Sequence, residues 1–219
     1  MKQIVLDFLS ELKENNTREW FQANKKQYEA AKSEVEQFVN LVIPGIAKFD
    51  ESLKFVTAKD CMFRIFRDVR FSHDKSPYKI NMGAWMSGKG RKSSGPGYYI
   101  HFQPGESFLA AGVYMPMPDQ LKKIRSEIYY NAAEFKSILA DPGVRNYAKE
   151  LSDYGKSKMA PRDFPRDFPD IDLLKYKHYT LDLPLSDKEV LSTKFHEEVL
   201  RVFRAWYPFN TFLHRALEE

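Results

Sequence analysis

Two short strand-like segments joined by a tight turn lie near the middle of the chain, and they set the strongest constraint on its fold. Residues 98–103 and 107–114 each read as a strand, and Pro104-Gly105-Glu106 between them is typical of a hairpin turn. Strands this close in sequence must pair antiparallel, because a parallel pair needs a crossover of a dozen residues or more. The sequence therefore predicts an antiparallel sheet rather than alternating βαβ units.

Helical periodicity flanks this hairpin on both sides. Residues 3–13 predict a short amphipathic helix, and a second, longer helix is expected from a capping box at Asn16 and Glu19 until Pro44-Gly45. After the hairpin we expect a helix from Pro118 to about Leu139 and another that begins at Asp141-Pro142. A strand is expected over Lys177–Leu183. The last helix begins with a capping box at Ser186 and Glu189, and Pro208 ends or kinks it.

This order of elements predicts an α+β fold, with a central antiparallel sheet and N-terminal and C-terminal helices packed on it. Hydrophobic residues make up 43% of the chain and aromatic residues 15%, which is enough apolar surface for one core. We expect a single domain over residues 1–219. Its N-terminal helices lie in 1–48, its sheet region in 55–115, and its helical region with the C-terminal helices in 118–219.

The distribution of charge is uneven. The whole chain carries a net charge of only +4, but residues 54–92 hold ten Lys or Arg against three Asp, a local net charge of +7. A basic segment inside a nearly neutral chain indicates a local site for an anion better than a surface that binds polyanions everywhere.

The densest chemistry in this segment lies between Arg64 and Tyr78. Alternation over residues 61–71 predicts a strand from which Arg64, Asp68 and Arg70 project on one face. Guanidinium groups placed in this way can hold a phosphate or a carboxylate, and Asp68 can fix their rotamers. The predicted ligand-binding residues are Arg64, Arg67, Arg70, Lys75, Tyr78 and His101, and the catalytic candidates are Asp68, Asp74 and Tyr78.

The run Arg-x-x-Arg-Asp-x-Arg-Phe at residues 64–71, followed by Asp-Lys-x-x-Tyr at 74–78, resembles the signature of an uncharacterised, mainly bacterial family, domain-of-unknown-function family 2461. Residues 97–101 and 105–108 resemble the central hairpin of that family, and the proline-rich segment and the overall length are similar as well. The resemblance covers nearly the whole chain. It marks residues 64–78 as signature positions but implies no reaction.

Other sites are not indicated by the sequence. The five histidines are scattered, with no His-Glu-x-x-His and no Cys-x-x-Cys, so no metal is predicted. Residues 83–90 nearly match a nucleotide-binding loop, but Gly90 stands where a Ser or Thr is required, and no cofactor is predicted. A single cysteine, Cys61, and the lack of a long apolar run lead us to expect a soluble, cytoplasmic protein without membrane partners.

Three functions remain open at this point. The first is a site for a small anionic ligand that bears a phosphate or a carboxylate. Whether the protein is also an enzyme stays open. The second is a nucleic-acid-binding module that uses the same cations together with Lys89, Arg91 and Lys92. The third is a structural or protein-interaction domain in which Arg67 and Asp68 belong to an internal ion-pair network. The residues carry no signal for an oligomeric state.

Overall fold

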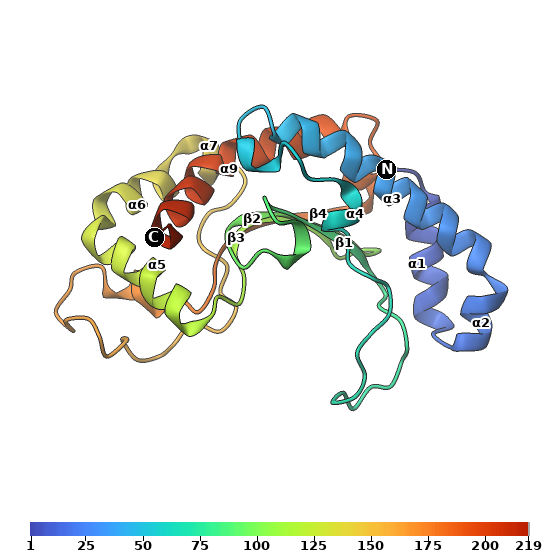
Figure 1. Ribbon diagram of the computed structural model, residues 1–219, viewed down its shortest axis with the longest axis horizontal. Helices are drawn as coiled ribbons and strands as arrows, with labels where there is room; N and C mark the ends of the chain where they lie inside the picture. The colour runs from blue at the N-terminus through green and yellow to red at the C-terminus, as the bar shows by residue number, and fades with distance from the viewer. Residues whose placement is uncertain (219) are drawn as a thin grey trace. The chain divides into compact units, whose positions relative to one another are not determined.

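The computed structural model describes residues 1–218, and in these residues helices and a four-stranded antiparallel sheet form an α+β fold, as predicted (Figure 1). The strand order is β1-β2-β3-β4. The strands are β1 (Met82–Met86), β2 (Gly97–Phe102), β3 (Ser107–Val113) and β4 (Tyr179–Leu185). The α-helices are α1 (Ile4–Glu14), α2 (Arg18–Ala23), α3 (Lys25–Ile46), α4 (Ala58–Cys61), α5 (Pro118–Tyr130), α6 (Ala132–Ala140), α7 (Pro142–Arg145), α8 (Asp187–Val190) and α9 (Phe195–Leu217). Short 3-10 helices span Glu51–Leu53, Gly90–Lys92 and Ile171–Lys175.

The chain forms two compact units. Unit 1 contains residues 1–91, 99–109 and 184–201, and unit 2 contains residues 92–98, 110–183 and the chain from 202 onward. Strands β2, β3 and β4 and helix α9 each contribute residues to both units. The single domain remains a prediction.

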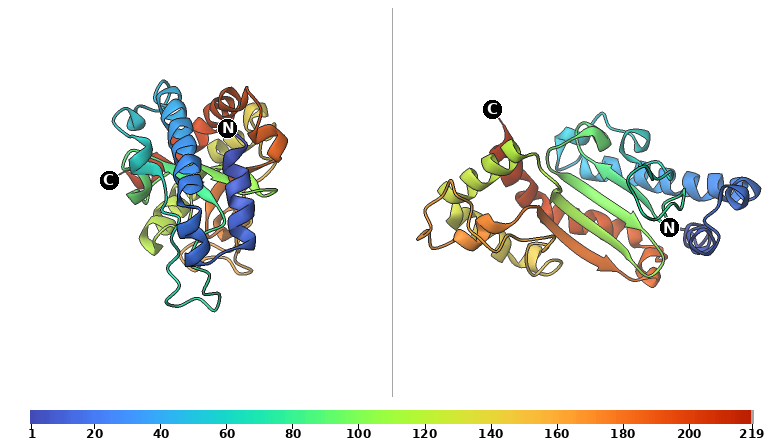
Figure 2. Two further views of the ribbon diagram at one scale, coloured as in Figure 1. Left: turned by 90° about the vertical axis from the view of Figure 1, so that its right-hand side faces the viewer. Right: turned by 90° about the horizontal axis from the view of Figure 1, so that it is seen from below.

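The helices of unit 1 pack through the apolar faces that the sequence predicts. Helix α1 buries Val5, Phe8 and Leu9 and packs against α3, and Figure 2 shows the two helices side by side. The start of α2 corrects one prediction, because its N-cap is Thr17, whose hydroxyl accepts a hydrogen bond from the backbone N–H of Trp20 at 3.2 Å. Asn16 is not the cap.

Helix α3 also continues one residue beyond the expected end. It passes through Pro44 and Gly45 and ends at Ile46. Gly45 is needed here for space, since a Cβ at this position would lie 2.5 Å from a methyl carbon of Leu200. The glycine therefore serves close helix packing within unit 1 rather than helix termination.

The prediction of a regular strand over residues 61–71 is wrong. Cys61 ends helix α4, and the chain that follows pairs only through isolated antiparallel bridges, Met62 with Ala84 and Phe66 with Tyr78. Pro77 interrupts the ladder because it has no backbone N–H to donate. Residues 62–79 form an extended hairpin that runs beyond β1 to a turn (Figure 1), and we call it the signature arm.

Unit 2 has an aromatic core. Phe135 of α6 packs against Phe209 and Phe212 of α9, with ring centroids 6.0 and 4.9 Å apart. Helix α9 continues through Pro208 to Leu217, so this proline does not end the helix. Trp206 is fully buried on the same helix.

The capping box of Ser186 and Glu189 is confirmed in unit 1, but it begins the short helix α8, and α9 starts separately at Phe195.

Candidate functional site

Arg67 holds the two sides of the signature arm together. Its Nη1 donates to the carboxylate of Asp74 and, at 3.2 Å, to the carbonyl oxygen of Ser76, while its Nη2 donates to the hydroxyl of Ser72 at 3.3 Å. Hydrogen bonds from the side chain and backbone of Ser76, followed by that from Arg67, lower the pKa of Asp74 to about 2. Asp74 is therefore ionised at neutral pH.

Arg70 and Asp68 form a second pair on the same arm. Nε of Arg70 donates to Oδ1 of Asp68 at 2.9 Å, and Nη2 donates to Oδ2 at 2.6 Å. These bonds lower the pKa of Asp68, so this carboxylate also stays charged. Both side chains of this pair are solvent-exposed, so the pair contributes little to the stability of the fold.

The other predicted site residues lie in different surroundings. Arg64 is exposed and acts on Asp68 only through its charge, and Lys75 donates to the carbonyl oxygen of Val69 at 3.0 Å. Tyr78 is only 3% exposed and stacks on Phe21 with ring centroids 3.9 Å apart. The arginine–aspartate pairs are thus brought together, while Tyr78 belongs to the core of unit 1.

Asn16 fastens the base of the signature arm to the N-terminal helices. Its side chain donates to the carbonyl oxygen of Tyr78 at 3.0 Å and accepts from the backbone N–H of Tyr78 at 3.1 Å. This amide completes both backbone hydrogen bonds of one arm residue, in the way that a neighbouring strand would.

His101 lies on β2, in a chain of hydrogen bonds along one face of the strand. The hydroxyl of Tyr99 lies 2.9 Å from Nδ1 of His101, and Nε2 of His101 lies 3.2 Å from Oε1 of Gln103. Gln103 in turn donates its Nε2 to Glu106 at 2.7 Å. Since Oε1 of Gln103 only accepts, Nε2 of His101 carries the proton and Nδ1 accepts from Tyr99. The chain fits a neutral imidazole.

Burial lowers the pKa of His101 and outweighs the opposite effects of Gln103 and Glu106. A histidine whose pKa is lower in the folded state contributes stability that is present above its ordinary pKa of 6.5 and is lost as the pH falls through the folded value. We therefore expect the melting temperature of the wild-type protein to fall between pH 7.5 and 5, and His101→Gln to make this fall smaller. Thermal unfolding followed by circular dichroism over this pH series measures both slopes.

Tyr99→Phe is the companion variant for this test. It removes the hydroxyl that donates to the neutral imidazole, so the pKa of His101 rises toward its ordinary value and the pH dependence again becomes smaller. Equal slopes in the wild-type protein and both variants would contradict the assignment.

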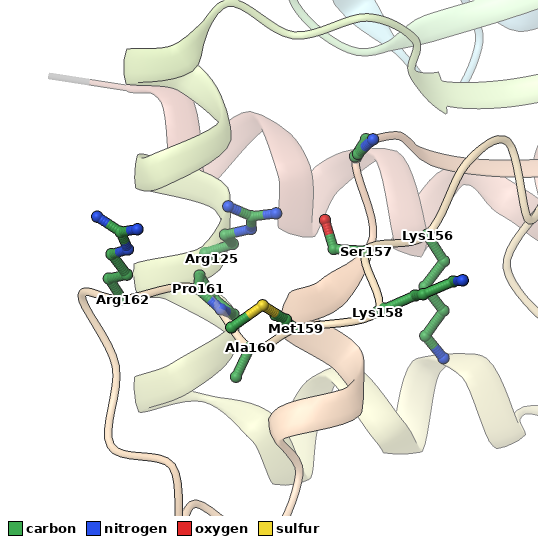
Figure 3. Close-up of a pocket in the computed structure, with 9 residues that line it drawn as sticks. Arg125, Lys156, Ser157, Lys158, Met159, Ala160, Pro161 and Arg162 are labelled. Atoms are coloured by element: carbon green, nitrogen blue, oxygen red, sulfur yellow. The ribbon is translucent and has the colours of Figure 1, made fainter.

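A basic pocket in unit 2 was not predicted from the sequence. Its cavity has a volume of about 500 Å³ and is lined by Arg125, Lys156, Ser157, Lys158, Met159, Ala160, Pro161, Arg162 and Lys177 (Figure 3). Five of these residues are cationic and none is acidic. We call this cavity the basic pocket.

The geometry of the basic pocket centres on Arg125 of α5. Its Nη2 donates to the carbonyl oxygen of Tyr176 at 3.0 Å, but its Nε is buried and has no hydrogen-bond partner among residues 1–218. In Figure 3 the guanidinium extends toward Ser157, whereas the side chains of Lys156 and Lys158 extend away from it. Within the described chain, none of the five cations lies within 4.0 Å of a carboxylate oxygen, so their charges are not neutralised by ion pairs.

The loop that supplies most of the lining is held in place. The backbone N–H of Ser157 donates to the carbonyl oxygen of Lys175 at 2.9 Å, and Nζ of Lys156 lies 4.5 Å from the ring centroid of Tyr176. Further along, Phe164 and Phe168 both pack on Tyr129, with ring centroids 5.5 and 4.8 Å away. Lys156, Lys158 and Arg162 are thus presented on a loop that these contacts hold in place.

The basic pocket cannot be recognised from the order of charged residues in the sequence. Residues 153–177 contain six Lys or Arg but also five Asp, so the segment is nearly neutral. The aspartates are outside the lining, and Arg125 joins it from a distant helix. The cationic residues of the pocket are therefore grouped apart from these aspartates only in the folded chain.

The family model described as conserved hypothetical protein (DUF2461) matches residues 4–212. No curated protein and no solved structure matches the chain. Among residues 1–218, no helix is long and apolar enough to cross a membrane, and no group of three or more His, Cys, Asp or Glu is placed to hold a metal ion.

Proposed function

The chain belongs to the DUF2461 family, which is described only as conserved hypothetical proteins, and from the geometry of its basic pocket we propose that it binds a small anionic ligand there, one that bears a phosphate or a carboxylate. One observation carries the proposal. Arg125 brings a guanidinium to a cavity that has four more cationic residues in its lining and no acidic one.

The electrostatics of the pocket favour an anion. Five positive charges around one cavity repel one another, and a bound anion relieves this repulsion. A guanidinium can form two parallel hydrogen bonds to a phosphate or carboxylate, and charge-assisted bonds of this kind are the strongest that proteins form. The hydroxyl of Ser157, which Arg125 faces in Figure 3, supplies a further donor. The lysines attract the ligand through their charge.

The size and chemistry of the lining indicate the class of ligand. A volume of about 500 Å³ is in the range of pockets for small molecules and exceeds what a single inorganic phosphate needs. The lining contains no His, Asp, Glu or Cys that would act as an acid, a base or a strong nucleophile. We therefore propose recognition of the ligand at this pocket.

Calorimetric titration with inorganic pyrophosphate tests the proposal. We expect Arg125→Gln to weaken binding by about tenfold or more, because a hydrogen bond to a charged group contributes roughly 1.5–3 kcal/mol. Arg145→Gln is the matched control, since Arg145 is an exposed arginine of unit 2 that lies outside the pocket lining. It should bind pyrophosphate as the wild-type protein does.

Two results would contradict the proposal. One is the absence of binding of pyrophosphate, phosphate and citrate by the wild-type protein. The other is an equal loss of affinity in Arg125→Gln and Arg145→Gln, which would show that only the general charge of the surface attracts these anions.

A further inference from the structure

The signature arm ends in a nearly bare aromatic ring. Phe71 is 94% exposed at the turn of the arm, and the guanidinium carbon of Arg70 lies 5.8 Å from the centroid of its ring. The tip thus presents two planar groups, a phenyl ring and a guanidinium, next to each other. Figure 2 shows the arm extending away from α1 and α3.

The arm holds this tip in one arrangement. Arg67 ties Asp74, Ser76 and Ser72 together, and the ammonium of Lys75 is bonded across the turn to the carbonyl oxygen of Val69. A tip that is ordered before it binds loses less conformational entropy when it does bind.

The charge of the arm favours an acidic partner. Residues 62–79 contain five Lys or Arg and two Asp, a net charge of +3. Both aspartates already accept hydrogen bonds from arginines of the arm, so their charges are compensated internally. Two further cations of the arm, Arg64 and Lys75, are exposed and form no ion pair among the described residues.

From these features we propose that the signature arm binds single-stranded nucleic acid. Unpaired bases stack on aromatic rings and on guanidinium planes, and their phosphates pair with nearby cations. Phe71 and Arg70 supply the stacking surfaces, and Arg64 and Lys75 supply phosphate contacts. An acidic protein would match the positive charge of the arm, but its binding would not require the phenyl ring of Phe71 and the guanidinium of Arg70 to lie next to each other. The arm and the basic pocket share no residue, since the arm belongs to unit 1 and the pocket lining to unit 2.

Fluorescence anisotropy with labelled oligothymidylate and oligouridylate, each about twenty nucleotides long so as to exceed the site size, tests the proposal. We expect Phe71→Ala to weaken binding by roughly 5- to 100-fold, the loss that accompanies removal of one stacked base. Phe55→Ala is the matched control, because Phe55 is 96% exposed, belongs to unit 1 and lies outside the arm. It should leave the affinity unchanged. Equal melting temperatures of the three proteins show that folding is preserved.

The salt dependence gives a second measurement. We expect Arg64→Gln to reduce the slope of log K against log salt by roughly 0.7, as for one lost phosphate contact to a single strand. The variant Arg125→Gln should keep its affinity for the oligonucleotides, which separates this inference from the proposed function.

Three outcomes would overturn the inference. The first is that neither oligonucleotide binds at low salt, and the second is that Phe55→Ala loses as much affinity as Phe71→Ala. The third is that Phe71→Ala leaves oligonucleotide binding intact but abolishes attachment to vesicles of anionic phospholipid. In that last case the arm contacts membranes and not nucleic acid.

Discussion

Gly112→Ala is expected to reduce the free energy of unfolding by about 4 kcal/mol or more, or to prevent accumulation of folded protein. Gly112 lies in β3 with a φ of +122°, a conformation that residues with a Cβ rarely adopt. A Cβ here would lie only 2.0 Å from the carbonyl oxygen of Tyr179 and 2.9 Å from Cα of Thr180. Both of these are backbone atoms of β4, so relief of the clash requires the strands of unit 2 to separate.

Urea denaturation followed by tryptophan fluorescence measures this effect, and Gly105→Ala is its control. Gly105 also has a positive φ, +72°, but nothing lies within 4 Å of the position where its Cβ would be. It should therefore show only the backbone cost of about 1–2 kcal/mol. Similar losses in the two variants would contradict the close approach of β3 and β4 at Gly112.

Trp206→Ala is the second substitution with a large expected effect. Trp206 is fully buried in α9, near Phe203, and truncation of a buried tryptophan costs about 3–5 kcal/mol through lost apolar contacts and the cavity left behind. Its indole Nε1 has no hydrogen-bond partner among residues 1–218, so Trp206→Phe loses no such bond and should cost less, roughly 1–2 kcal/mol.

The same urea series tests this order. Thr211→Ala on the exposed side of α9 should change the free energy of unfolding by no more than about 0.5 kcal/mol. A loss in Trp206→Ala no larger than in Thr211→Ala would show that this side chain is not part of the packed core.

The parts of the fold that obey local rules were predictable from the sequence. The central hairpin follows from two strand-like segments on either side of the turn at Pro104-Gly105-Glu106, and the capping box of Ser186 and Glu189 follows from side chains three residues apart. The α+β class then follows from the order of the elements. Each of these features depends on neighbours in sequence, which a pattern can reveal.

The errors arise where tertiary contacts override local pattern. Strand β1, Met82–Met86, was missed because its buried positions do not alternate and it contains Gly83, which is required by the close approach of the Tyr99 hydroxyl. Residues 61–71 alternate as a strand does, but they pair only through two isolated bridges, one to Ala84 of β1 and one to Tyr78 on the returning side of the arm, where Pro77 breaks the ladder.

In the candidate sites, contacts between neighbours in sequence were also predictable, and contacts between distant residues were not. The pairing of Asp68 with an arginine was predictable, because the two residues are close in sequence, and the structure shows it with Arg70. The bond between Asn16 and Tyr78 joins positions 62 residues apart, and the basic pocket joins Arg125 to a loop and to Lys177. No spacing in the sequence signals contacts over such distances.

The proposed function requires the anion to bind in the basic pocket, and amide chemical-shift mapping with pyrophosphate tests this location most directly. ¹⁵N-labelled wild-type protein would be titrated at constant ionic strength while the backbone amide signals are followed. We predict saturable shifts concentrated at residues 156–162 and near Arg125 and Lys177. Shifts concentrated instead at residues 64–75 would place the anion on the arginines of the signature arm, and either that result or the absence of saturable shifts would contradict binding in the basic pocket.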